Sequence, residues 1–252
     1  MIKKSNFRLI LIAGLWLLSA SLFAKQDTLR VLFIGNSFTY YYNLPQVVHT
    51  MAASDNVTLI TRQMTIGGSN LELHWKGEKD SRAKQMIEEE PWDFVVLNNH
   101  SLATINDPEG FVDYSKKFVD LIREKGARPV MMMTWAYKSN PLMQKTISEA
   151  YKAFCQAHEV EFVPAGEIIG EARRNRPDLN LFADDKHPSH NGTYLLGLSF
   201  YKFFSGKNVS AISPRIITKD KDGEKLYLLI TLPEDATFMK QVVDEFQFKT
   251  AN

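Results

Sequence analysis

The sequence predicts an α/β protein, a three-layer α/β/α sandwich around a five-stranded parallel sheet of flavodoxin-like type. Two observations lead to this prediction. Short runs rich in aliphatic and β-branched residues alternate with helix-like segments of about ten or more residues, the spacing that parallel strands with crossover helices require. Runs such as FVVL, residues 94–97, are apolar at every position, which is expected when both faces of a sheet are covered.

The individual elements are delimited by glycine and proline. Pro45 lies in the first turn of one helix, Pro91 closes a second, and Gly126 and Gly206 stop two others. The expected strands are residues 28–34, 57–64, 94–97, 129–134 and 160–163, and the expected helices are residues 44–53, 80–90, 110–125, 141–158 and 191–204. Each connection is then long enough to return the chain to the same edge of the sheet.

The last part of the chain departs from this alternation. Asp222-Gly223 precedes a β-rich run at residues 227–232, which predicts a hairpin strand, and Pro233 then opens a terminal helix. There is no internal repeat, low-complexity linker or composition shift that would mark a domain boundary. Residues 25–252 are therefore expected to form one domain with a C-terminal hairpin and helix as an extension.

The first 24 residues have the pattern of a secretory signal peptide. Lys3, Lys4 and Arg8 form a basic segment, residues 9–23 are apolar, and Ala24 offers a small residue for cleavage. An uncleaved membrane anchor is the alternative, although the apolar run is short for a helix that needs about 20 residues to span a bilayer. The sequence therefore predicts an exported protein, periplasmic or secreted.

Charge and cysteine content exclude several classes of protein. Cleavage removes three of the 30 basic residues and none of the 29 acidic ones, which leaves a formal charge of about −2. Such a balance gives no electrostatic reason to expect nucleic acid, and after cleavage no membrane partner is expected. Cys155 is the single cysteine, so no intramolecular disulfide can form, and its helical context predicts a buried, inert thiol.

Polar residues collect after the strands of the predicted sheet. Ligand and substrate sites of open parallel sheets form beyond the carboxyl ends of the strands. The residues found there are Gly35, Asn36 and Ser37 after the first strand, Gly67, Gly68, Ser69 and Asn70 after the second, Asn98, Asn99, His100 and Ser101 after the third, and Thr134 and Trp135 after the fourth. Asp184 and His187 stand in a loop just before the last core helix.

This set of residues has the groups that acyl transfer needs. A serine hydroxyl is a weak nucleophile, and His187 can accept its proton. Asp184, three residues earlier, can hold the imidazole in the required tautomer. The backbone N–H groups of Ser37 and Gly68, with an amide side chain, can stabilise an oxyanion. This chemistry needs no cofactor and no metal.

Each feature also has a simpler interpretation. Taken alone, Ser37 after a strand is more often a helix cap or turn residue, and a glycine pair is more often a turn. The cluster of Asp184, Asp185, His187 and His190 could bind a metal, although no further ligands follow at helical spacing. Residues 40–42, three tyrosines, could form the rim of a site or pack in the interior.

Taken together, the motifs resemble those of the SGNH, or GDSL-type, hydrolases. Gly35-Asn36-Ser37-Phe38 is similar to the block that carries the nucleophilic serine, Gly68 to the glycine of the second block, and Asp184-x-x-His187-Pro188 to the block that supplies acid and base. The run His187-Pro188-Ser189-x-x-Gly192-x-Tyr194-Leu195 resembles an exported bacterial branch of that family. The resemblance covers about residues 30–210. The nucleophile lacks the G-x-S-x-G pattern of α/β-hydrolases.

One block departs from the family pattern. The third block usually reads G-x-N-D, and its asparagine is the side-chain donor of the oxyanion hole. The corresponding segment here is Leu97-Asn98-Asn99-His100-Ser101. Counting positions along the strand places His100 where the family has its asparagine, whereas residue type favours Asn98 or Asn99 for that role. We take Asn98, the first residue after the strand, as the expected donor, with Asn99 and His100 as alternatives.

The resemblance implies a serine esterase with Ser37 as nucleophile, His187 as base and Asp184 as its partner. Because exported bacterial members often act on glycans, O-acetyl groups on carbohydrates are the expected substrate, with Trp75, Trp135 and Tyr40 as candidates for stacking on a sugar. The alternatives are a lipase or thioesterase, a catalytically silent glycan-binding protein on the same scaffold, and a metal-dependent hydrolase. The expected partner is a small-molecule or glycan ester, and the sequence leaves the oligomeric state open.

Overall fold

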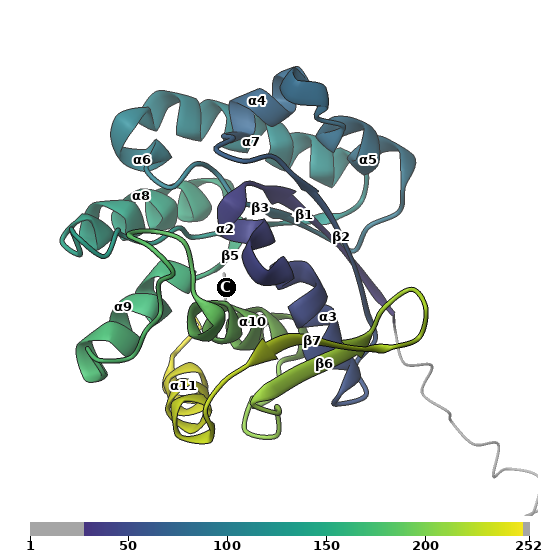
Figure 1. Cartoon of the computed structure of the whole chain (residues 1–252). Helices are drawn as coiled ribbons and strands as arrows, with labels where there is room; N and C mark the ends of the chain where they lie inside the picture. The colour runs from purple at the N-terminus through teal and green to yellow at the C-terminus, as the bar shows by residue number, and fades with distance from the viewer. Residues whose placement is uncertain (1–27, 249–252) are drawn as a thin grey trace, which may run out of the picture.

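The computed structural model describes residues 28–248, and the segment assigned as a signal peptide lies outside them. Its centre is a five-stranded parallel sheet with the order β2-β1-β3-β4-β5 (Figure 1). The strands are β1 Leu29–Gly35, β2 Leu59–Thr65, β3 Phe94–Leu97, β4 Arg128–Met132 and β5 Glu161–Val163. The sheet order is the flavodoxin-like one, and the predicted three-layer α/β fold is confirmed.

Helices cover both faces of the sheet, as Figure 1 shows. Alternate residues of β1 point to opposite faces: Val31 and Phe33 pack with α3, α9 and α10, while Leu32 and Ile34 pack with α4, α5, α7 and α8. The helices are α2 Ser37–Tyr40, α3 Leu44–Ala53, α4 Leu71–Lys76, α5 Ala83–Glu89, α6 Ala103–Asn106, α7 Pro108–Glu124, α8 Met143–His158, α9 Ala165–Asn175, α10 His190–Ser205 and α11 Pro233–Glu245.

The structure adds helices that the sequence pattern does not predict, of which α9 is the longest. Two glycines, Gly166 and Gly170, lower the helix propensity of this segment. Gly166 is needed for packing, because a Cβ atom there would lie only 2.1 Å from the carbonyl oxygen of Thr134. The glycine that weakens the sequence signal thus allows α9 to pack closely against the end of β4.

The C-terminal extension is a hairpin followed by a helix. β6 (Arg215–Lys219) pairs antiparallel with β7 (Lys225–Ile230), with an irregularity between Ile216 and Ile217. Ile216 and Leu229 anchor the hairpin by packing into the same core as α3 and α10. None of the helices in residues 28–248 is both long and apolar enough to cross a membrane.

Candidate active site

Ser37 lies at the sharp turn between β1 and α2. Asn36 caps the helix, since its side-chain oxygen accepts from the Phe38 N–H at 3.0 Å. Gly35 allows the turn to pass close to the end of β3, because a Cβ atom there would lie 2.7 Å from the Cβ of Asn98. Ser37 is therefore presented at the carboxyl edge of the sheet, half-buried, and its own N–H makes no hydrogen bond within residues 28–248.

The side chain of Asn36 connects the three loops at this edge. Its amide nitrogen donates to the carbonyl oxygens of Ser69, at 2.9 Å, and Asn99, at 3.0 Å. These two carbonyls follow β2 and β3, respectively, so one buried amide fixes both loops relative to the turn that carries Ser37. An aspartate could not make these two bonds, because an ionised carboxylate only accepts hydrogen bonds.

Ser37, His187 and Asp184 form a continuous hydrogen-bonded chain. His187 Nε2 lies 2.9 Å from Ser37 Oγ, and His187 Nδ1 lies 2.6 Å from Asp184 Oδ2. Because an ionised carboxylate can only accept, Nδ1 carries the proton, and the lone pair of Nε2 faces the serine hydroxyl. The structure thus brings together the three residues that the sequence analysis singled out.

The Asp184 carboxylate is held ionised by its surroundings. Its partial burial acts to raise its pKa, but hydrogen bonds from the His187 ring and from the backbone N–H groups of His187 and Lys186 outweigh this effect. The pKa of Asp184 therefore lies well below its usual range. The carboxylate remains available to fix the tautomer of His187 throughout the neutral pH range.

The loop that carries Asp184 and His187 is anchored to the segment after β4. Trp135 Nε1 donates to the Lys186 carbonyl at 2.8 Å. The carboxylate of Asp185 accepts from the backbone N–H and the hydroxyl of Ser139, at 2.7 and 2.8 Å. Through these contacts, the position of His187 also depends on the segment after β4.

Gly68 belongs to a tight turn after β2. The Ser69 N–H donates to the carbonyl of Ile66 at 3.2 Å, and Gly68 has φ of +68°, as the third residue of a type II turn requires. A residue with a side chain would be strained in this conformation. The Gly68 N–H makes no hydrogen bond within the described residues, so it is a second unused donor at the same edge.

Asn98, the expected donor, is engaged inside the protein. This side chain is completely buried; its oxygen accepts from the Thr39 hydroxyl at 3.0 Å, and its nitrogen donates to the Asn99 carbonyl at 3.0 Å. Both ends of its amide are thus engaged inside the protein. Asn98 instead braces the end of β3 against the turn that carries Ser37.

The amide of Asn99 is engaged differently, although this residue is also buried, at 2% exposure. Its side-chain oxygen accepts from the backbone N–H groups of Leu71, at 3.2 Å, and His100, at 2.8 Å. Because these groups only donate, the orientation of the amide is fixed. Its nitrogen makes no hydrogen bond in the described part of the chain, and this amide is a third unused donor. Burial, with a smaller contribution from nearby Lys186, lowers the pKa of the third alternative, His100.

The aromatic residues proposed for sugar stacking have different environments. Trp135 is fully buried and stacks on Phe38 with 4.1 Å between ring centroids, so it is a core residue. Trp75 is partly buried against Phe118 on the α4 side of the sheet. Tyr40 is 38% exposed, and its hydroxyl lies beside the glycine turn, 3.2 Å from where a Cβ atom of Gly67 would stand.

A second serine–histidine pair lies beneath the site. Ser69 Oγ is 2.9 Å from Nε2 of His74, but both side chains are buried, and both also contact the Gly35 carbonyl. His74 Nδ1 faces the hydroxyl of Ser81 at 2.7 Å rather than a carboxylate. This pair has no carboxylate partner and no access to a substrate, so its role is to support the turn that carries Ser37.

We expect His74 to make stability depend on pH. Burial lowers its pKa in the folded protein, against an opposing hydrogen bond to the Gly35 carbonyl. The unfolded chain, with a histidine pKa of about 6.5, therefore takes up a proton before the folded one does, and the free energy of unfolding falls as pH drops below about 6.5. Urea unfolding at pH 7.5 and 5.5 should show a smaller loss in His74→Gln than in the wild type. Equal losses would contradict this prediction.

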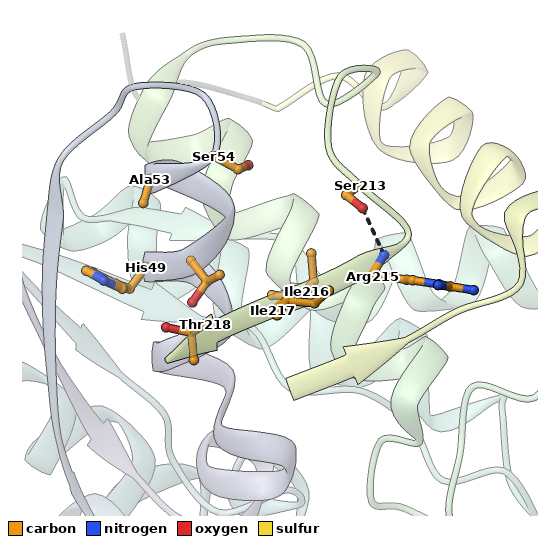
Figure 2. A pocket seen from close by; sticks show the side chains of 9 residues that line it. His49, Ala53, Ser54, Ser213, Arg215, Ile216, Ile217 and Thr218 are labelled. Carbon is orange, nitrogen blue, oxygen red and sulfur yellow. Dashed lines mark hydrogen bonds between the residues drawn. The ribbon is translucent and has the colours of Figure 1, made fainter. Parts of the chain in front are cut away.

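The remaining candidates for chemistry are not assembled into sites. Within residues 28–248, no group of three or more His, Cys, Asp or Glu side chains is arranged to hold a metal ion. Cys155 is a buried free thiol, as predicted, and burial raises its pKa to about 12. A hollow of about 250 Å³ lies between α3 and β6, and the titratable side chains that line it are His49 and Arg215 (Figure 2).

Sequence reasoning missed the two hydrogen bonds of the Asn36 amide and the stacking of Tyr41 on His187, although it named residues 40–42 as a possible rim and Asn99 as an alternative donor. The sequence analysis treated Asn36 only as part of the turn. It gave Asn99 as an alternative to Asn98 for the side-chain donor of the oxyanion hole. For Tyr41, its position four residues after Ser37 was the available signal. That spacing places it one turn beyond the nucleophile, at the same edge of the sheet.

The comparisons with known proteins concern the fold. No protein-family model and no curated protein sequence matches the chain. Among solved structures, a DUF4886 family protein from Bacteroides uniformis is similar with a TM-score of 0.67 and 21% identity, over 86% of this chain and 94% of that one. A Slackia heliotrinireducens protein designated an SGNH hydrolase has a TM-score of 0.60 and 21% identity, over 71% of this chain and 100% of that one.

A catalytic mutant of an acetylxylan esterase from Geobacillus stearothermophilus is also similar. Its TM-score is 0.51 at 17% identity, over 70% of this chain and 95% of that one. All three proteins have low sequence identity to this chain, so the similarity is one of fold. The chain has the fold of the SGNH-type hydrolases, as its motifs led us to expect.

Proposed function

We propose that this protein is an exported serine esterase that removes O-acetyl groups from carbohydrates. The observation that carries the proposal is the chain from Ser37 through His187 to Asp184, with distances of 2.9 and 2.6 Å, at the carboxyl edge of an SGNH-type sheet. The acetylxylan esterase with the same fold supports the acyl group and the substrate class. The basic and apolar N-terminal segment supports export.

The reaction follows from the direction of these hydrogen bonds. Ser37 Oγ attacks the ester carbonyl carbon while its proton passes to Nε2 of His187. The tetrahedral intermediate collapses, and the same proton leaves with the sugar hydroxyl. Water then attacks the acetyl-serine, again with His187 as base, and acetate and free Ser37 are formed. Asp184 stabilises the imidazolium that forms in both steps.

Three donors can stabilise the oxyanion of each intermediate. Ser37 N–H, Gly68 N–H and the side-chain amide of Asn99 come from the loops after β1, β2 and β3, and all three lack partners within residues 28–248. Asn36 joins these loops through its two hydrogen bonds, so the donors are held in place before the substrate binds. Donors fixed in advance lower the barrier because they need no reorganisation during the reaction.

The role of Asn99 can be tested with two substitutions. Asn99→Asp keeps an oxygen for the N–H groups of Leu71 and His100 but loses the donor, whereas Asn99→Ala loses both. We expect each to lower kcat for p-nitrophenyl acetate by about 10²–10³-fold. Thermal unfolding shows whether the fold is retained. If Asn99→Asp keeps the wild-type kcat, Asn99 is not the donor.

The substrate is tested by acetate release. Acetylated xylo-oligosaccharides should lose acetate in the presence of the wild type but not of Ser37→Ala, and EDTA should have no effect. Faster hydrolysis of long-chain acyl esters or acyl thioesters than of acetylated sugars would indicate a lipase or thioesterase. Binding of the sugars without any acetate release would indicate a silent glycan-binding protein, and loss of activity in EDTA would indicate a metal-dependent hydrolase.

Tyr40 is the aromatic residue best placed to contact the sugar. It is exposed beside the glycine turn that carries one of the oxyanion donors. A tyrosine ring at such a position can pack against the apolar face of a pyranose. Because Trp135 is buried in the core, it cannot stack on a sugar.

A further inference from the structure

The imidazole of His187 is covered on one face by Tyr41. The two ring centroids lie 4.2 Å apart and the ring planes differ by 4°, so the rings are stacked in parallel. Phe38 approaches the same imidazole edge-on, at 6.1 Å. Tyr41 is half-buried, so its ring is held between the imidazole and the surface of the protein.

The backbone around Tyr41 fixes this ring close to the nucleophile. The Tyr41 N–H donates to the carbonyl of Ser37 at the end of α2. The next two residues, Tyr42 and Asn43, have φ of +48° and +52°, a left-handed conformation that residues with side chains rarely adopt. Tyr42 in turn packs edge-on against His190, at 4.2 Å. The turn is thus held by the N–H of Tyr41, just before the strained residues, and by the ring of Tyr42, the first of them.

The stack acts differently on the two forms of the imidazole. The face of a tyrosine ring carries partial negative charge and attracts a cation placed over it. His187 is neutral before the reaction and becomes an imidazolium as it takes the proton of Ser37. The contact with Tyr41 is therefore stronger in the transition state than in the ground state, and an interaction of this kind raises kcat rather than lowering KM.

We propose that Tyr41 is a positioning residue that acts through His187. Its ring keeps the imidazole in the plane in which Nδ1 reaches Asp184 and Nε2 reaches Ser37, and it stabilises the imidazolium formed in both halves of the reaction. This inference rests on the proposed function. It assigns the effect to the ring and not to the hydroxyl, which makes no hydrogen bond within residues 28–248.

Within residues 28–248, the ion pair of His187 is with Asp184. Asp184 contacts Nδ1 from the same loop, and Lys186 is the neighbouring residue, with its ammonium 5.6 Å from the ring centroid of Tyr137. The elements packed against the ring, α2 and the turn after it, contribute Ser37, Phe38 and Tyr41, which are uncharged at neutral pH. Replacing the ring of Tyr41 therefore leaves the charged groups around His187 unchanged.

Three variants test the proposal. Tyr41→Leu and Tyr41→Met remove the ring, and Tyr41→Phe keeps it and removes the hydroxyl. With p-nitrophenyl acetate, the first two should lower kcat about 3–30-fold with little change in KM, the range that corresponds to a cation–π contact. Tyr41→Phe should stay within about twofold of the wild type. The acid limb of the kcat/KM profile should move to lower pH in Tyr41→Leu and Tyr41→Met, because the imidazolium loses its stabilising partner.

The outcomes separate this inference from the proposed function. If Ser37→Ala is inactive while Tyr41→Leu and Tyr41→Met keep the wild-type kcat and pH profile, the role of Tyr41 is disproved and the esterase proposal stands. An equal loss in Tyr41→Phe and Tyr41→Leu would assign the effect to the hydroxyl and overturn the inference. If Ser37→Ala remains active, the proposed function itself fails. Two ring-free variants of different shape guard against a folding defect in one of them.

Discussion

Ser37→Ala should abolish esterase activity, with kcat for p-nitrophenyl acetate falling by about 10⁴-fold or more, as for other serine hydrolases without their nucleophile. The covalent route is lost because alanine cannot form the acetyl-enzyme. Ser101→Ala is the matched control. Ser101 is at the same edge of the sheet, and its hydroxyl pairs with that of Tyr137 at 2.9 Å, so this variant should keep most of the activity.

The prediction distinguishes Ser37 from Ser69, the other serine at this edge that contacts a histidine. The partner of Ser69, His74, is fully buried and meets a serine hydroxyl where His187 meets a carboxylate. A Ser37→Ala variant as active as the wild type would show that the chain from Ser37 to Asp184 does not carry the reaction. Thermal unfolding of the variant, which should match the wild type, is the control for its fold.

Asp184→Asn should lower kcat about 10⁴-fold, a loss of the size seen when the acid of a serine triad becomes an amide. The amide nitrogen can donate to Nδ1 of His187, which would leave the proton on Nε2, the atom that has to accept from Ser37. Because the pKa of Asp184 lies well below its usual range, the wild type should not lose activity through protonation of this carboxyl group between pH 5 and 8, about the physiological range.

Asp185→Asn is the matched control for this prediction. Its carboxylate is adjacent in sequence but accepts from the N–H and hydroxyl of Ser139, contacts that an asparagine can largely reproduce. We expect its kcat to stay within about tenfold of the wild type. Similar losses in Asp184→Asn and Asp185→Asn would mean that the loop needs charge in general and that Asp184 has no specific partnership with His187.

The positions of the strands along the chain, and the loops at the carboxyl edge of the sheet, could be predicted from the sequence because each depends on local patterns. Apolar runs ending in Gly35 or in the amide segment after Leu97 mark both the strands and the loops that follow them. The two halves of the site, Ser37 and Asp184 with His187, were predicted because both lie in short motifs. Their contact, across 150 residues of sequence, follows from the parallel sheet.

The features that the sequence could not predict depend on how side chains are oriented and packed in the folded protein. Asn98 and Asn99 are the same residue type, and only the pleat of the strand end and the hydrogen-bond partners of each amide distinguish them. Trp135 is placed in the core by its stack on Phe38, a contact between distant segments. α9 was missed because Gly166, which lowers helix propensity, is required by the packing of that helix on Thr134.

The central claim is that Ser37 is a nucleophile activated by His187. Covalent labelling of the reactive serine tests it most directly. An organophosphonate that reacts with activated serines should modify the wild-type protein once, and mass spectrometry of its peptides should place the adduct on Ser37. The adduct should be absent from Ser37→Ala and strongly reduced in His187→Ala, because the hydroxyl is activated only when His187 accepts its proton. Modification of a different serine, or hydrolysis of p-nitrophenyl acetate that continues unchanged after Ser37 is labelled, would contradict the account.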